Sequence, residues 1–448
     1  MNRDRLDFGN EKIGKLFRAM FFPTLTGMLF NSVLNLCDGM FVGHGVGSNA
    51  LAAVNIVAPL FLLCTGIGLM FGIGASVIGG IRLAESNVKA ARIVMTQAYI
   101  AGALIFGAVI LVSLLFTRPL LYMLGCSPVL EPYATDYLLW LLPGLMFFYL
   151  QCAGMMLIRL DGSPKFAMAV QLVGATLNIV LDWVMVFPLA MGLKGAAIAT
   201  SLSCIVSGLM VLCYFLFYSD KLKFYRLRLT LKSLRLSLRN TGYMLKIGLA
   251  TFIAELSLGI MMVIGNFQFM DYLGEVGVAA YSVGCYLFPL IFSINNAVAQ
   301  SAQPILSYNY GADNRARVSR TLRVALWAAL CCGVIITLSM WVGAPLLAAV
   351  FLNPAEAAYG LAVKGLPLLG TCAVFFALNI TFIGYYQSLE RAGRSIACML
   401  LRGVIFLVPA FLVLPRLLGV DGLWLAITAS EAATLAAILL LTTVRSRR

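Results

Sequence analysis

Long apolar segments follow one another along almost the whole chain and are separated by short polar stretches. A hydrocarbon core of ~30 Å is crossed by ~20 apolar residues in a helix, and these segments reach or exceed that length. The pattern predicts twelve spans, at residues 16–42, 51–81, 93–117, 133–157, 166–189, 195–218, 243–270, 277–307, 321–351, 361–387, 396–415 and 422–444. We therefore expect an all-α polytopic membrane protein.

Composition supports a membrane protein. Of the 448 residues, 61% are hydrophobic and only 11% are charged, and the mean hydropathy is +0.95. Soluble domains carry about 25% charged residues, so a soluble core of this size would have to bury far more apolar surface than usual. The chain is too apolar for a soluble domain.

The basic residues predict the orientation. If the N-terminus is cytoplasmic, all but four of the 32 Lys and Arg lie on the cytoplasmic side. The exceptions are Arg118, Lys194, Lys364 and Arg416. This asymmetry predicts an even number of spans with both termini inside, and we expect a multi-pass protein of the bacterial cytoplasmic (inner) membrane. The net charge of +14 then reflects topology and attraction to membrane lipids rather than nucleic-acid binding.

The chain contains an internal repeat. At one constant offset, identical residues recur at Ala53 and Ala280, Asn87 and Asn314, Pro188 and Pro415, Gly192 and Gly419, Gly195 and Gly422, and Ala199 and Ala426. When the two halves are shifted by two further residues relative to this offset, Asp161 also aligns with Glu390. With six spans in each half, the repeats are parallel and related by a pseudo-twofold axis along the membrane normal. We expect a six-helix lobe at 1–218, a basic cytoplasmic linker at 219–240 and a second six-helix lobe at 241–448.

Two carboxylates, Asp38 and Asp182, lie inside apolar segments, where an ionised group costs several kcal/mol unless it pairs, takes up a proton or binds a cation. Counted at a helical rise of about 1.5 Å per residue, both lie in the outer half of the predicted membrane, together with Asn178 and Thr200. Two carboxylates, an amide oxygen and a hydroxyl suit a hard monovalent cation, and a close carboxylate pair also suits a proton. The alternative is that these residues only hydrogen-bond helices together.

The second half carries a different set of buried charges. Glu255, Arg402 and Glu431 lie in three of its predicted spans, whereas positions aligned with Asp38 and Asp182 are not ionisable. The three residues are candidates for a buried charge network or for substrate recognition, because a carboxylate without a basic partner attracts a lipophilic cation. The halves therefore share a pattern of spans but not of charges.

Several stretches in a fixed order make the chain resemble the multidrug and toxic compound extrusion (MATE) family, most closely its bacterial MepA-like branch. Pro23 lies fifteen positions before Asp38. The other stretches are DGMFVGHGVG at 38–47, RLDGSPK at 159–165, NIVLD at 178–182, GLKGAAIAT at 192–200 and QPILSYNYGA at 303–312. The resemblance covers nearly the whole chain.

The resemblance implies a twelve-helix secondary antiporter that exports cationic, often aromatic, amphipathic compounds in exchange for H⁺ or Na⁺ by alternating access. It assigns the coupling cation to Asp38, Asn178, Asp182 and Thr200, and it assigns the bending of the first helix to Pro23. Glu255 matches a glutamate of the NorM-like branch, but Asn379 stands where that branch has an aspartate. By this resemblance we expect no cofactor, no metal site beyond possible Na⁺ at the four cation-site residues, and a monomer.

Other classes fit less well. An enzyme is not expected, because the single histidine, His44, offers no convincing nucleophile and base pair. A lipid-linked oligosaccharide flippase of related architecture is the main alternative. We would expect such a flippase to have a cavity rich in arginine, whereas Arg402 is the only arginine that the sequence places centrally.

Overall fold

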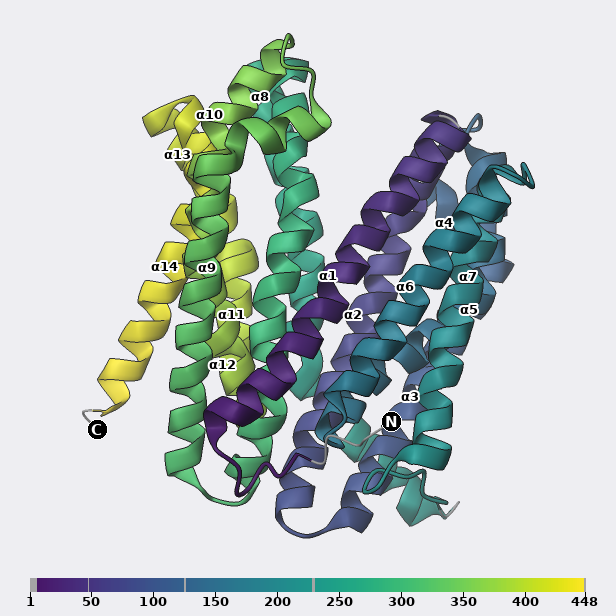
Figure 1. Ribbon diagram of the computed structural model, residues 1–448, viewed down its shortest axis with the longest axis vertical. Helices are drawn as coiled ribbons and strands as arrows, with labels where there is room; N and C mark the ends of the chain where they lie inside the picture. The colour runs from purple at the N-terminus through teal and green to yellow at the C-terminus, as the bar shows by residue number, and fades with distance from the viewer. Residues whose placement is uncertain (1–5, 47, 125, 228–229, 447–448) are drawn as a thin grey trace. The chain divides into compact units, whose positions relative to one another are not determined.

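A computed structural model describes residues 6–46, 48–124, 126–227 and 230–446, and within these ranges the chain forms helices and no strands. The helices of the first half run side by side (Figure 1). They are α1 (Ile13–Gly45), α2 (Ser48–Ala84), α3 (Val88–Leu115), the short α4 (Thr117–Met123), α5 (Glu131–Leu160), α6 (Pro164–Val186), α7 (Gly192–Cys213) and the π-helical turn η1 (Tyr214–Tyr218).

The second half begins with α8 (Leu231–Gly311), which is two helices joined at Gly274, a residue with a non-helical φ of 64°. The remaining elements are α9 (Arg315–Phe351), α10 (Ala357–Gly370), α11 (Cys372–Ser388), α12 (Ala392–Leu400), the π-helical turn η2 (Leu401–Ile405), α13 (Leu407–Leu418) and α14 (Val420–Ser446). Three expected spans are each built from consecutive pieces: α7 with η1, α10 with α11, and α12 with η2 and α13.

The twelve-helix prediction is confirmed. Among the described residues, ten helical stretches are long and apolar enough to cross a membrane. One of them contains both helices of α8, and α1, with 33 residues, supplies the twelfth span. The largest difference in a boundary is at the seventh span, which the sequence predicts to begin at residue 243. Its helix begins at Leu231, where the Thr230 hydroxyl accepts a hydrogen bond from the Ser233 N–H. Hydropathy indicates where a helix is apolar and does not indicate where it begins.

The chain divides into two compact units. Unit 1 contains residues 1–252 and 307–314, and unit 2 contains 253–306 and 315–448. Both ends of α8 therefore pack with unit 1, although the sequence prediction assigns residues 241–252 and 307–311 to the second lobe. The predicted division follows the sequence repeat, whereas the compact units follow the contacts between residues. The lobes at 1–218 and 241–448 and the linker at 219–240 therefore stay predictions.

Asp161 attaches the beginning of the basic linker to unit 1. Its Oδ1 accepts hydrogen bonds from the N–H groups of Lys221 and Leu222, both at 3.1 Å. Its Oδ2 accepts hydrogen bonds from the Tyr214 hydroxyl at 2.7 Å and the Ser219 hydroxyl at 2.9 Å. Because one carboxylate satisfies several donors of the linker, this segment is held by unit 1 rather than being a free connection.

The repeat reappears in the backbone. Ser86 and Asp313 are separated by the offset of the repeat, and both have positive φ, at 59° and 50°. Gly192 and Gly419 share the same offset, with φ values of 59° and 62°. Non-glycine residues rarely adopt this conformation, so equivalent turns in the two halves indicate a common structure.

Two pairs of equivalent positions also meet within unit 1, between α2 and the end of α8. A Cβ atom on Gly80 would lie 2.4 Å from the Oγ of Ser307, its equivalent in the repeat. A Cβ atom on Gly311 would lie 3.1 Å from the Cβ of its equivalent, Ala84. Small residues at these positions allow the two backbones to approach closely.

Gly248 supports a sharp test of packing between α8 and α2. A Cβ atom there would lie only 2.0 Å from the backbone oxygen of Met70, and backbone cannot move aside as a side chain can. We expect Gly248→Ala to destabilise the protein by about 1–3 kcal/mol, measured by thermal unfolding in detergent. Gly259→Ala, on the same helix with no atom within 4 Å of the new Cβ, is the matched control. Equal melting temperatures for the two variants would contradict this description of the packing.

Candidate cation site

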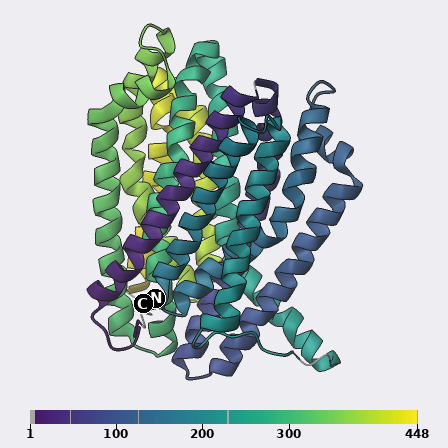
Figure 2. The same ribbon diagram turned by 45° about the vertical axis from the view of Figure 1, so that its right-hand side comes forward.

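Three helices of unit 1 bring the predicted cation-site residues together. Asp38 lies on α1, Asn178 and Asp182 lie one turn apart on α6, and Thr200 lies on α7. Helix α6 packs against both α1 and α7, and Figures 1 and 2 show α1 running beside α6. The i, i+4 spacing places Asn178 and Asp182 on the same face of α6.

The four residues form two contacting pairs, Asn178 with Thr200 and Asp38 with Asp182. The Asn178 amide donates to the Thr200 hydroxyl at 3.3 Å, and that hydroxyl donates to the carbonyl of Ala196 at 3.1 Å. The carboxyl groups of Asp38 and Asp182 lie close enough to each other to interact. Two ionised carboxylates are acceptors only, so a hydrogen bond between them requires a proton on one of the two.

The site is rich in buried acceptor atoms. The side chains of Asp182 and Asn178 are 0% and 1% exposed. Both carboxylate oxygens of Asp182, Oδ1 of Asp38 and Oδ1 of Asn178 are buried without an N–H or O–H donor from the described part of the chain. A buried acceptor without a donor is costly, and these atoms are all oxygens. This group of oxygen atoms therefore suits a proton or a hard cation such as Na⁺.

Sequence reasoning missed Tyr137 at this site. This tyrosine, on α5, is buried and lies close enough to both Asp38 and Asp182 to interact with their charges. Its hydroxyl is a donor as well as an acceptor, which distinguishes it from the carboxylates. No signal in the sequence separates Tyr137 from the other aromatic residues of the spans.

A close approach of α1 to α6 lies further along the same face of α6. Gln171 is seven residues before Asn178, and a Cβ atom on Gly27 of α1 would lie 1.9 Å from the Gln171 Oε1. Pro23 lies inside α1, one turn before Gly27. Because proline donates no backbone hydrogen bond, α1 is weakened next to this crossing; the bending role of Pro23 stays a prediction.

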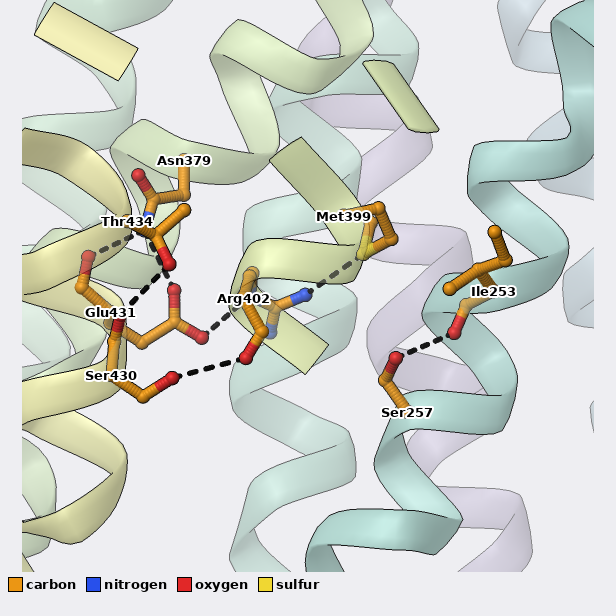
Figure 3. A network of polar contacts seen from close by, with 8 residues as sticks. All are labelled: Ile253, Ser257, Asn379, Met399, Arg402, Ser430, Glu431 and Thr434. Atoms are coloured by element: carbon orange, nitrogen blue, oxygen red, sulfur yellow. Dashed lines mark hydrogen bonds and ion pairs between the residues drawn. The ribbon is translucent and has the colours of Figure 1, made fainter. Parts of the chain in front are cut away.

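A second polar network lies in unit 2 and is drawn in Figure 3. Arg402, in the π-helical turn η2, donates from Nε to Glu431 Oε1 at 2.5 Å. The Asn379 amide donates to Glu431 Oε2 at 2.8 Å, and the Arg402 guanidinium stacks 4.0 Å from the centre of the Phe376 ring. Arg402 and Glu431 are 6% and 4% exposed at their side chains, so this is a buried ion pair with further polar and aromatic support.

Glu255 is not part of this network. It lies on α8 and is 8% exposed, but no hydrogen bond or ion pair links it to Arg402 or Glu431 among the described residues. The structure thus pairs two of the three predicted charges and leaves the third separate. A role in substrate recognition stays a prediction for each of them.

Among the described residues, no group of three or more His, Cys, Asp or Glu side chains is arranged to hold a metal ion. The side chain of His44 lies outside the described residues.

Twelve apolar helices, buried carboxyl groups inside them and a buried ion pair are the features of a polytopic membrane protein. The MatE family profile matches this chain at residues 23–184 and again at 250–412. The chain therefore belongs to the MatE family, a family of multidrug efflux transporters and not of enzymes. Its two matches begin at positions separated by the offset of the internal repeat.

Named relatives match along nearly their full length. The chain is 24% identical over 428 residues to the multidrug export protein MepA of Staphylococcus saprophyticus, covering 95% of this chain and 92% of that protein. It is 22% identical over 436 residues to MepA of Staphylococcus aureus strain MRSA252, covering 96% and 95%. An outward-facing multidrug resistance MATE family transporter of the MOP superfamily is similar in fold, with a TM-score of 0.91, 22% identity and 99% and 98% coverage.

Proposed function

We propose that this chain is a secondary antiporter that exports cationic amphipathic compounds across the bacterial cytoplasmic membrane, with both termini inside. Its coupling ion in this proposal is the proton, exchanged at Asp38 and Asp182. The contact between these two carboxyl groups carries the proposal, because such a pair holds one proton readily and both charges only at a high free-energy cost. Sodium at the same oxygen ligands is the alternative ion.

The chemistry of the second unit supports cationic substrates. Glu255 is a buried carboxylate with no basic partner among the described residues, whereas Glu431 is neutralised by Arg402. An unneutralised carboxylate in an apolar surrounding attracts a cation, and a cationic drug brings that charge with it.

Export further requires that ion and drug favour different conformations or compete for one site. A ligand moves a conformational equilibrium only by its difference in affinity for the two states, and the effect between ion and drug is reciprocal. In the proposed cycle, drug loads from the cytoplasm, and protonation of the carboxyl pair from outside lowers drug affinity and allows release. The pair is then the element that couples the proton gradient to drug movement.

Dye transport in vesicles of purified protein tests this proposal. A pH gradient alone should drive a fluorescent cationic dye against its concentration gradient, and a sodium gradient alone should not. Movement driven only by sodium would overturn the choice of ion. Failure of both gradients to move dye, together with transfer of a lipid-linked oligosaccharide, would overturn the exporter and favour the flippase.

A further inference from the structure

A hollow opens on the surface of unit 2 between α9 and α11. Its volume is about 380 Å³. The lining is mostly apolar and has one charged residue: it comprises Leu322, Leu326, Leu330 and Leu378, with Ser319, Arg323 and Trp327. Because residues four apart in a helix lie on one face, three leucines of α9 form one row, and Arg323 and Trp327 form a second row beside it.

The groove lies on a surface of α9 that faces lipid. The most apolar part of α9 is only 22% buried, the smallest share among the membrane-spanning stretches that the structure describes. Trp327 is 63% exposed. In a membrane protein such exposed apolar surface contacts lipid, and tryptophan is enriched at the level of the headgroups.

Helix α9 runs antiparallel to the span built from α10 and α11, which places the charged part of the groove at one end of that span. Trp341 Nε1 donates to the Pro367 carbonyl at 2.9 Å, and the Thr337 hydroxyl donates to the Gly370 carbonyl at 2.8 Å. Later residues of α9 thus lie beside earlier residues of the span that α10 and α11 build. Arg323 stands near the beginning of the predicted span 321–351, at the boundary of the apolar region.

Two of the basic residues at this end of the groove are without a partner in the described part of the chain. Four arginines, Arg315, Arg317, Arg320 and Arg323, fall within nine residues. Neither Arg320 nor Arg323 makes a hydrogen bond or an ion pair with the described part of the chain. No acidic residue lines the groove. An exposed arginine beside an apolar groove can extend along the apolar surface and hold its charge at the membrane boundary.

We propose that this groove binds an anionic glycerophospholipid of the surrounding bilayer. Its phosphate pairs with Arg323, with Arg320 one turn away, and an acyl chain lies along the leucine row. The guanidinium favours a phosphate geometrically as well as by charge. The site takes a lipid with net negative charge in preference to a zwitterionic one, because the latter carries a cation that the arginines repel. This inference does not depend on the proposed transport cycle.

Trp327 serves as a natural reporter, and Trp341 on the same helix is its control. Both are exposed, but only Trp327 lines the groove. Two versions of the full chain would keep buried Trp424 and either Trp327 or Trp341, with the other tryptophans replaced by Phe. Each is placed in vesicles of phosphatidylcholine and phosphatidylglycerol at 3:1, and fluorescence quenching is compared with bromine on one lipid or on the other.

We expect Trp327 to be quenched preferentially by brominated phosphatidylglycerol, and Trp341 to show no preference. Arg323→Gln should lower the relative binding constant at Trp327 about fivefold, since one basic residue near the surface contributes about a factor of five for an anionic lipid. Arg235→Gln, at another exposed arginine, should leave it unchanged. The same preference at both tryptophans, no preference at Trp327, or equal effects of the two substitutions would overturn the proposal.

Native mass spectrometry of the otherwise unchanged protein provides a measurement that needs no tryptophan replacement. The protein should retain phosphatidylglycerol more strongly than phosphatidylcholine, and Arg323→Gln should reduce this difference. Retention of both lipids to the same degree by the natural chain would also overturn the proposal.

Discussion

Asp182→Asn is expected to abolish gradient-driven export of a cationic dye and to leave the protein folded. The asparagine keeps the size of the side chain and its place on α6, but it cannot release a proton. Because Asp182 is fully buried and contacts Asp38, no solvent-exposed group can take over its exchange of a proton. The measurement is dye accumulation in vesicles under a pH gradient, with the melting temperature as the check on folding.

Asp136→Asn is the matched control for this substitution. Asp136 is an exposed carboxylate on α5 in the same unit, and its replacement removes the same charge without touching the pair. It should transport at the natural rate. Dye transport by Asp182→Asn at the level of the control would remove Asp182 from the coupling mechanism.

Arg402→Leu is expected to destabilise the protein strongly, by about 3–5 kcal/mol. The substitution leaves Glu431 buried with only the Asn379 amide as a partner for its carboxylate. An uncompensated buried charge is far more costly than the loss of one contact. Thermal unfolding in detergent should show a large fall in melting temperature.

The double variant Arg402→Leu with Glu431→Leu separates charge from packing. It should be more stable than Arg402→Leu alone, because it removes both members of the pair. Arg416→Leu, at an exposed arginine on α13, should change stability little. A double variant less stable than the single one would show that the cost comes from packing rather than from the unpaired carboxylate.

The spans could be predicted from the sequence because each depends on local composition. An apolar segment long enough to cross a membrane has to satisfy its backbone within the helix, so the predicted limits lie within a few residues of the helix ends at most spans. The exception at Leu231 arises because a polar, amphipathic stretch continues the helix outside the apolar region. Hydropathy carries no information there.

The grouping of Asp38, Asn178, Asp182 and Thr200 could also be predicted, because carboxylates inside apolar spans are few and the depth of each residue follows from counting. The contribution of Tyr137 could not, since an aromatic residue is common in spans and only the packing of α5 places it beside the carboxylates. Separation of Glu255 from the Arg402–Glu431 pair likewise depends on which helix faces which.

One detail of the repeat is corrected by the structure. The sequence comparison aligns Asp161 with Glu390, but the residues of positive φ in these loops are Gly162 and Glu390, at 86° and 56°. The gap at this loop is therefore one residue instead of two. The π-helical turn η2, Leu401–Ile405, accommodates a further residue, because a π-helical turn contains one more residue than an α-helical turn. That extra residue lies in the turn that carries Arg402.

The central claim is that binding of a cationic drug and protonation of Asp38 and Asp182 exclude each other. The most direct test is to add a cationic dye to purified protein in weak buffer and to measure protons released into solution. The natural protein should release about one proton for each dye molecule bound, and Asp182→Asn should bind dye without release. Equal proton release by the two proteins, or dye binding to the natural protein without any release, would contradict the account.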